Sequence, residues 1–345
     1  MSIFSYSIVF ISAGLLGAVF TFFALKLAIK FNITDSPGLL RKMHLHKTPL
    51  LGGLGVFLAF FVVLSFIRSQ LLEGNLQPHH WLGFFVGACF LMIGGFLDDK
   101  YSLKPGQQII WPILAAVAVI IGGVQIEKIT NPFGGLVYLQ YFSPLLIFVW
   151  LLGMMYTTKL LDGIDGLVTS VTAVGSFIIF LFTMTTRYYQ PDVGVAALVL
   201  AGACLGFLFF NWHPAKIFLG EGGSLLLGYI LGVLAIISGG KIAIALLIMG
   251  IPIMDVAWTI FRRLRAGKNP FKFSDRQHLH FRLLDLGLSQ RQTVFVYCAF
   301  SAVFGLTALF LQSQGKILML ALLGFIMLSI VISLNYLEKR QRKDS

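Results

Sequence analysis

Eleven runs of mostly apolar residues, each about as long as a membrane-spanning helix, dominate this sequence. A helix that crosses the hydrocarbon core of a bilayer needs roughly 17–25 such residues. The expected spans lie near residues 3–29, 50–72, 81–97, 109–125, 141–158, 168–186, 193–210, 223–238, 241–260, 292–312 and 316–337. We therefore expect an all-α, polytopic integral membrane protein with about eleven transmembrane helices, forming one membrane-embedded domain over residues 1–345.

The small share of charged residues excludes the soluble classes of protein. Charged residues make up 12% of the chain and hydrophobic residues 57%, whereas a soluble domain carries roughly 25% charged residues. Such a chain cannot cover the surface of a soluble enzyme, and it is too apolar to be disordered. Its three cysteines lie inside apolar runs, so neither a disulfide framework nor a metal cluster is expected.

The distribution of basic residues predicts the orientation in the membrane. If the loop that follows the first span is cytoplasmic, alternation places 21 Lys and Arg residues on the cytoplasmic side and 5 on the other. Cytoplasmic loops carry the excess of basic residues, so we expect the N-terminus outside, the C-terminus inside and a cytoplasmic loop at about 261–291. The net charge of +12 follows from this topology, and no nucleic-acid partner is expected.

Two pairs of carboxylates fall at span ends on the predicted cytoplasmic face. Asp98 and Asp99 lie in GGFLDDKYSLKP, where charges beside a bilayer are costly unless cations offset them; the alternative is a solvated helix end. Asp162 and Asp165 lie in KLLDGIDGL, where the i, i+3 spacing puts both on one face if the segment is helical. The alternative for this second pair is a helix start with Asp as the N-cap.

Two further segments on this face carry polar groups suited to phosphate. Glu221 begins EGGSLLLGY at the start of a span, which resembles a helix N-terminus able to receive phosphate, or else a capped loop. His278 and His280 lie between Arg276 and Arg282 in a basic loop that suits a polyanionic ligand. Carboxylates near phosphate favour Mg²⁺, whereas zinc spacing, a Walker loop and a dinucleotide fingerprint are absent from the sequence.

Five motifs in order give the chain its family resemblance: HKTPLLGG, GGFLDDK, LLDGIDGL, FLGEGGSLLLG and DRQHLHFRL. They resemble the polyprenyl-phosphate N-acetylhexosamine-1-phosphate transferases, of the glycosyltransferase 4 type, over about residues 35–290. The segment HLHFRLLDLG resembles the corresponding loop in the branch of the family that uses UDP-N-acetylglucosamine. The chain departs from the family pattern at four positions: Tyr156 and Lys159 replace Asn, Glu221 replaces Asp and Phe281 replaces His.

The resemblance implies an enzyme of the bacterial inner membrane that transfers N-acetylglucosamine-1-phosphate from UDP-GlcNAc to undecaprenyl phosphate and releases UMP. This would be the first membrane step of a cell-envelope glycan such as lipopolysaccharide or teichoic acid, with a homodimer left open. The alternatives are the phospho-MurNAc-pentapeptide transferase of peptidoglycan synthesis, or an enzyme for another UDP-amino sugar. A cation-coupled transporter is disfavoured because the acids lie at span ends and no internal repeat is visible.

The resemblance also suggests a role for each candidate residue. Asp98 and Asp99 would position the acceptor or take its proton, with a covalent aspartyl-phosphate route left open. Asp162 and Asp165 would complete the catalytic set, and Asp165 and Glu221 would hold Mg²⁺, or Mn²⁺ in its place. The expected substrate-binding residues are Lys47, Lys104, Lys159, Arg276, His278, His280 and Arg282.

Overall fold

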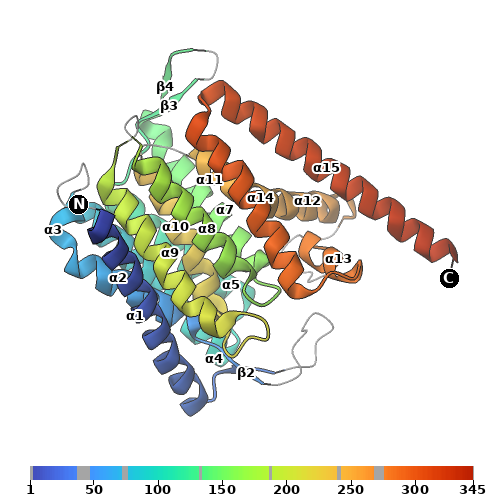
Figure 1. The fold of residues 1–345 in the computed structure, drawn as a ribbon, viewed down its shortest axis with the longest axis horizontal. Helices are drawn as coiled ribbons and strands as arrows, with labels where there is room; N and C mark the ends of the chain where they lie inside the picture. The colour runs from blue at the N-terminus through green and yellow to red at the C-terminus, as the bar shows by residue number, and fades with distance from the viewer. Residues whose placement is uncertain are drawn as a thin grey trace.

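The computed structural model describes residues 3–36, 47–71, 77–131, 134–185, 189–238, 242–267 and 276–344, which form a helical bundle (Figure 1). Its helices are α1 Ile3–Lys30, α2 Gly52–Phe66, α3 Arg68–Leu71, α4 Pro78–Tyr101, α5 Pro105–Gln108, α6 Ile110–Ile121, α7 Ser143–Leu161, α8 Leu167–Thr183, α9 Pro191–Asn211, α10 Gly220–Ile237, α11 Ile242–Ile248, α12 Gly250–Arg265, α13 Leu279–Asp285, α14 Gln290–Phe310 and α15 Ser313–Asp344. Two short antiparallel hairpins join helices, β1 Thr34–Asp35 with β2 Thr48–Pro49 and β3 Lys128–Thr130 with β4 Leu136–Tyr138.

The all-α polytopic prediction is confirmed, and each predicted span coincides with one or two helices. In the described residues, seven helices are long and apolar enough to cross a membrane, or up to eight if a bent pair counts as one span. Three shorter apolar helices cover the other predicted spans: Gly52–Phe66, Pro105–Ile121 and Leu167–Thr183. The count of eleven crossings and the orientation of the chain stay predictions.

The expected span over residues 241–260 is a bent pair of helices and not one continuous helix. The segment forms α11 and α12, which are bent by 81° at Met249. Pro252 explains the break, because proline lacks a backbone N–H and its ring would clash with the carbonyl of residue 248 in a continuous helix. The predicted loop at 261–291 is also partly helical, because α12 continues to Arg265 and α13 follows; residues 268–275 lie outside the described part.

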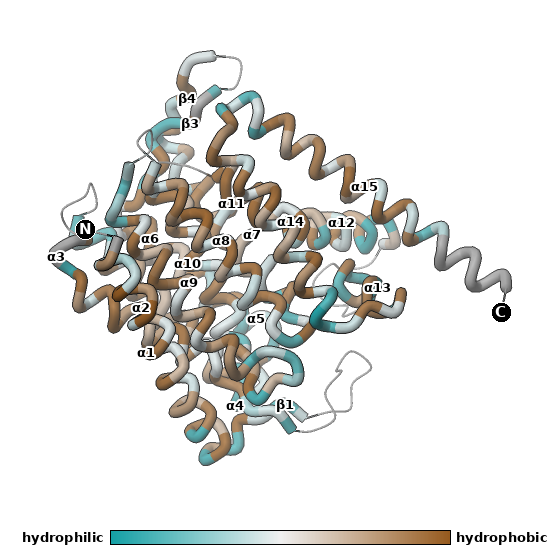
Figure 2. Tube along the Cα trace, viewed as in Figure 1, coloured by the Kyte–Doolittle hydropathy of each residue, from teal (hydrophilic) through white to brown (hydrophobic). Residues whose placement is uncertain are grey.

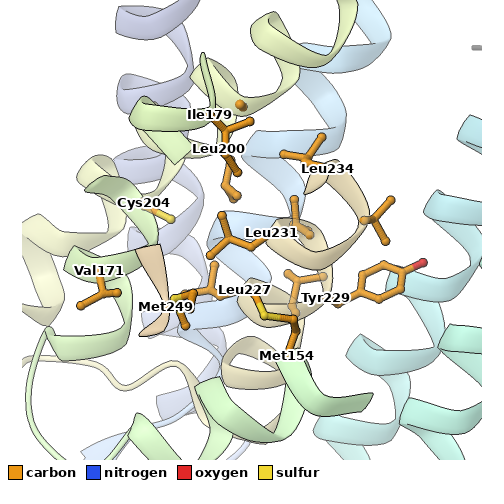
Figure 3. Packing of buried hydrophobic residues seen from close by; sticks show 14 of the residues in the cluster. Met154, Val171, Ile179, Leu200, Cys204, Leu227, Tyr229, Leu231, Leu234 and Met249 are labelled. Atoms are coloured by element: carbon orange, nitrogen blue, oxygen red, sulfur yellow. The ribbon is translucent and has the colours of Figure 1, made fainter. Parts of the chain in front are cut away.

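Helix α10 forms the centre of the bundle and packs against α7, α4, α2 and α8. Figure 3 shows Leu227, Leu231 and Leu234 of α10 among buried side chains of the neighbouring helices. Tyr229 is fully buried, and its hydroxyl donates a hydrogen bond of 2.9 Å to the carbonyl of Phe84 in α4. That bond satisfies the polar end of an aromatic side chain that has no access to water.

Glycine contacts fix the first turn of α10 between α2 and α4. A Cβ on Gly95 of α4 would overlap the backbone of Gly222, and a Cβ on Gly53 of α2 would overlap the backbone of Gly223. Small residues at helix interfaces let backbones approach closely, and this packing stabilises helix association in membranes. The ends of α4 and α7 and the start of α10 therefore meet at one end of the bundle, opposite the β3–β4 hairpin (Figures 1 and 2).

We expect Gly95→Ala to lower the midpoint of thermal unfolding in detergent, because the new methyl group has no room against Gly222. The matched control is Gly153→Ala in α7, where no atom lies within 4 Å of the added Cβ. Alanine stabilises an exposed helix position by about 1 kcal/mol relative to glycine, so the control should unfold at the same temperature or higher. Equal midpoints for both variants would contradict the proposed packing.

Candidate active site

A cavity of about 310 Å³ opens at the end of the bundle where these helix termini meet. Its walls come from the β1–β2 hairpin, the end of α4, the α7–α8 and α9–α10 connections and the start of α14. The described lining residues are Asp35, Leu50, Asp99, Lys159, Asp162, Gly163, Ile164, Asp165, Asn211, Phe218, Gly220, Glu221, Ser224 and Gln290. Five of the residues predicted from the sequence thus share one cavity: Asp99, Lys159, Asp162, Asp165 and Glu221.

Asp99 is held at the first turn of α10. The backbone N–H of Glu221 donates to Oδ1 of Asp99 at 3.0 Å and lies 3.3 Å from Oδ2. The turn before Glu221 requires glycine, because Gly220 has a φ of +73° and a Cβ there would overlap the Asp99 carboxylate. The start of α10 therefore presents a helix N-terminus to a carboxylate, as the charge of a helix dipole favours.

Asp98 has different surroundings, although it is the neighbour of Asp99 in the chain. Its Oδ1 accepts hydrogen bonds from the backbone N–H of Leu103 at 2.8 Å and from Nε2 of Gln108 at 3.0 Å. These bonds close the turn between α4 and α5, and Asp98 is outside the described lining of the cavity. The two adjacent aspartates therefore have separate roles, with Asp99 facing the cavity and Asp98 holding the turn beside it.

The DGIDG segment is a turn between helices. Helix α7 ends at Leu161, and α8 begins at Leu167 after Gly166, whose φ of +74° is the left-handed conformation that favours glycine. The structure thus disagrees with both sequence readings of this segment, because Asp162 and Asp165 are neither on a helix face nor at the N-cap of α8. Both nevertheless line the cavity.

Asp165 is tied to two other chain segments. Its Oδ2 lies 2.7 Å from Nδ1 of His213 and accepts a hydrogen bond of 3.0 Å from the backbone N–H of Ala215. The backbone N–H of Asp165 donates to Oε1 of Gln290, the first residue of α14, at 3.1 Å. This aspartate connects the α7–α8 turn to the α9–α10 connection and to α14.

Lys159 and Glu221 form an ion pair across the cavity wall. Lys159 lies in the last turn of α7 and Glu221 in the first turn of α10. The Lys159 Nζ atom also lies 3.5 Å from Oε1 of Gln108, the side chain that donates to Asp98. The last turn of α7 and the first turn of α10 are therefore in direct contact through these two side chains.

The predicted histidine loop supports the cavity from behind. His278 lies with Nδ1 2.9 Å from Oδ2 of Asp255, whose Oδ1 accepts a hydrogen bond of 2.9 Å from the backbone N–H of Leu279. His280 packs under the DGIDG turn so closely that a Cβ on Gly163 would overlap its ring. Both histidines are buried, and neither belongs to the described lining of the cavity.

The two arginines of this loop make contacts with neighbouring helices and not with the cavity, as far as the described residues show. Arg276 pairs with Asp285 at 3.2 Å. Arg282 is buried and donates to Oδ1 of Asn335 in α15 at 2.8 Å. His278, His280, Arg276 and Arg282 are thus outside the described lining of the cavity, and their expected role in substrate binding stays a prediction.

The two remaining predicted lysines are apart from the acidic cavity. Lys47 lines a neighbouring cavity of about 450 Å³ together with Lys216, Asn32, Thr34 and Thr48. The β1–β2 hairpin separates the two cavities, with Thr34 on one side and Asp35 on the other. Lys104 is exposed at the start of α5 and is outside the described lining of either cavity.

Several polar residues of the cavity are outside the set predicted from the sequence, among them Asp35, Asn211 and Gln290. Asn211 accepts a hydrogen bond of 3.1 Å from Thr169 and donates one of 3.0 Å to the carbonyl of Ile217, which orders the α9–α10 connection. A polar residue that ends a long apolar run was the available signal for Asn211. Asp35 and Gln290 stand alone among polar neighbours, so no local pattern distinguishes them.

Comparison with known proteins identifies a family and several relatives to which the chain is similar. Residues 81–239 match the family described as Glycosyl transferase family 4, a range that runs from α4 to the end of α10. The chain is 31% identical over 301 residues to a probable undecaprenyl-phosphate N-acetylglucosaminyl 1-phosphate transferase of Bacillus subtilis, covering 84% of this chain and 80% of that protein. It is 30% identical to a decaprenyl-phosphate N-acetylglucosaminephosphotransferase of Mycolicibacterium smegmatis, over 95% of this chain and 88% of that protein.

The chain is also similar to a relative whose name gives a different sugar. The chain is 31% identical over 290 residues to a phospho-N-acetylmuramoyl-pentapeptide-transferase of Halalkalibacterium halodurans, covering 79% of this chain and 86% of that protein. Similarity at this level extends over most of each protein. The chain therefore belongs to glycosyl transferase family 4, as a multi-pass membrane protein of that family.

Proposed function

We propose that the protein transfers N-acetylglucosamine-1-phosphate from UDP-GlcNAc to undecaprenyl phosphate and releases UMP. The observation that carries this proposal is the cavity that joins Asp99, the DGIDG carboxylates and Glu221 at one end of a membrane bundle. The names of the relatives from Bacillus subtilis and Mycolicibacterium smegmatis support a polyprenyl-phosphate acceptor and an N-acetylglucosamine phosphate group. The cavity lies at helix ends, where a lipid phosphate at the membrane surface and a water-soluble nucleotide can meet.

The proposed reaction is a phosphoryl transfer. An oxygen of the acceptor phosphate forms a bond to the β-phosphorus of UDP-GlcNAc, and the bond from that phosphorus to the bridging oxygen breaks, so that UMP leaves with the bridging oxygen. A phosphomonoester has a second pKa of about 6, so the acceptor is mostly a dianion and needs little help from a base. Catalysis of this kind depends mainly on positioning and on stabilising charge.

Mg²⁺, or Mn²⁺ in its place, is part of the proposal because the cavity is strongly acidic. Its described lining holds the five carboxylates of Asp35, Asp99, Asp162, Asp165 and Glu221 against one lysine. A diphosphate brings further negative charge, which a divalent cation held by these carboxylates would offset. Among the described residues, no three His, Cys, Asp or Glu side chains are grouped to hold an ion, but Mg²⁺ usually needs only one or two carboxylates besides water and phosphate.

Of the carboxylates, Asp162 and Asp165 suit the cation best. They lie on one turn of the cavity wall, and Asp165 is held in place by His213 and by the Ala215 N–H. Glu221, the other metal ligand expected from the sequence, is engaged with Lys159. Among the described residues, Asp99 forms no ion pair and its carboxylate accepts the Glu221 N–H, which suits a role in positioning the acceptor phosphate.

The choice of donor is tested by UMP release from the purified protein with undecaprenyl phosphate as acceptor. We expect UMP with UDP-GlcNAc and little or none with UDP-MurNAc-pentapeptide, because the loop reads HLHFRL and lacks three consecutive histidines. The similarity to the Halalkalibacterium halodurans transferase makes the second donor the necessary comparison. A preference for the peptide-bearing donor would replace the proposed substrate but keep the reaction class.

The separate surroundings of the two adjacent aspartates predict unequal effects of their removal. Asp99→Asn should lower turnover by about 10²-fold or more, the scale of one positioned catalytic group. Asp98→Asn should cost less, because an amide oxygen can still accept from Leu103 and Gln108. Initial rates of UMP release at saturating donor decide this, and a larger loss in Asp98→Asn would contradict the assignment.

The proposed cytoplasmic position of the cavity is tested by cysteine labelling in intact cells. Gln107→Cys and Arg265→Cys, both at exposed positions, should react with a membrane-impermeant maleimide only after the cells are opened. The positive control is Tyr138→Cys in the β3–β4 hairpin, which is 66% exposed at the opposite end of the bundle and should react from outside. Each variant is made in a chain whose Cys89, Cys204 and Cys298 are replaced by alanine.

Labelling of Gln107→Cys in intact cells would place the cavity outside the cytoplasm. Since UDP-sugars are made in the cytosol, that outcome would exclude the proposed donor.

A further inference from the structure

The charge balance of the acidic cavity makes Lys159 unusual. It is the one basic side chain in the described lining, which also holds five carboxylates. An ammonium at this position is the only charge of the described lining that attracts a phosphate oxygen. It therefore has to be directed into the cavity if the protein itself is to hold a nucleotide diphosphate.

Lys159 is directed by two fixed partners. Its ammonium forms the ion pair with Glu221, and it lies 3.5 Å from Oε1 of Gln108. Gln108 is itself fixed by two bonds of 3.0 Å, to Oδ1 of Asp98 and to the carbonyl of Leu103. The long lysine side chain therefore has a defined position, which removes much of the entropic cost of ordering it on a ligand.

Glu221 is equally fixed, because its backbone is part of the tightly packed first turn of α10. Its N–H donates to Asp99, and the glycines that follow it contact α2 and α4. Helices α7 and α10, which carry the pair, also approach closely: a Cβ on Gly228 would overlap Thr158 and the carbonyl of Met154. The side chains of Lys159 and Glu221 are 25% and 16% exposed, so the pair is shielded from bulk water yet open to the cavity.

The lengths of the two side chains fit their contact. Lys159 in the last turn of α7 and Glu221 in the first turn of α10 form an ion pair. Glutamate extends about 1.5 Å further than aspartate, a length that lets its carboxylate reach a lysine on the next helix. Lys159 adds a positive charge to the cavity, and Glu221 supplies the group that holds this charge in place.

We infer that Lys159 and Glu221 form one phosphate-binding unit, in which Glu221 positions the Lys159 ammonium to bind a phosphate oxygen of the nucleotide sugar directly. The inference rests on the proposed function, because it deepens the assignment of this cavity to a nucleotide diphosphate. A cavity with this unit should differ in one property from a cavity that holds carboxylates alone. The protein should retain affinity for UDP-GlcNAc when no divalent cation is bound.

The test measures binding of UDP-GlcNAc to the purified protein by calorimetry in the presence of EDTA. We expect the wild-type chain to bind, and Lys159→Asn to bind about 10- to 100-fold more weakly, the range for a lost hydrogen bond between charged groups. Lys159→Arg should restore binding, since it keeps the charge. Lys128→Asn, an exposed lysine of the β3–β4 hairpin, is the matched control and should bind as the wild type does.

The role of Glu221 is tested in the same assay and by Mg²⁺ titration of UMP release. If Glu221 positions Lys159, Glu221→Gln should weaken binding in EDTA, and Lys159→Asn with Glu221→Gln should bind no more weakly than Lys159→Asn alone. If Glu221 is instead a metal ligand, Glu221→Gln should leave binding in EDTA unchanged and raise the Mg²⁺ concentration for half-maximal rate. That second result would contradict the inference that Lys159 and Glu221 form one phosphate-binding unit.

The outcomes separate this inference from the proposed function. Absence of binding by the wild type in EDTA, or equal binding by Lys159→Asn, would overturn the inference while UMP release with Mg²⁺ still stood. Conversely, a wild-type chain that binds UDP-GlcNAc in EDTA but releases UMP from no UDP-sugar would contradict the proposed function and leave the binding unit intact. Thermal unfolding of each variant shows whether a loss of binding reflects a loss of folding.

Discussion

The contact of the first turn of α10 with α2 and α4 is the constraint on which the site depends. Backbone meets backbone at Gly53 and Gly223 and at Gly95 and Gly222, and no larger residue fits at these crossings. In a bilayer, lipid tails surround an apolar side chain as favourably as neighbouring apolar side chains do. Close packing of this kind is therefore a main source of helix association. It delivers the amide of Glu221 to Asp99 and the side chain of Glu221 to Lys159.

The same contact explains how five acidic side chains and a lysine can lie together near a membrane. Charges there are costly unless they are paired or hydrogen-bonded. The structure meets that cost locally: Asp99 receives a backbone N–H, Asp165 a histidine and a backbone N–H, and Glu221 a lysine. What remains is a polar cavity with an excess of negative charge, in which Lys159 is the one basic side chain of the described lining.

The helices and the gathering of the carboxylates could be predicted from the sequence, because long apolar runs and alternation through a bilayer leave few arrangements. Asp99, Asp162, Asp165 and Glu221 all precede or follow such runs on one face, and they share a cavity. The contacts within the site could not be predicted. Whether His278 turns toward substrate or toward Asp255, and whether Glu221 meets a cation or Lys159, depends on side-chain packing between segments 23 and 62 residues apart.

The hydrogen bond from the Asp165 amide to Gln290 has a consequence for how the protein is made. Gln290 lies 125 residues after Asp165, beyond the bent pair α11–α12 and the histidine loop. A nascent chain inserted into the membrane as far as α10 already contains Asp35, the DGIDG aspartates Asp162 and Asp165, and the Lys159–Glu221 pair. The turn that carries Asp165 acquires this acceptor only when α14 has left the ribosome, so the cavity wall is completed late in synthesis.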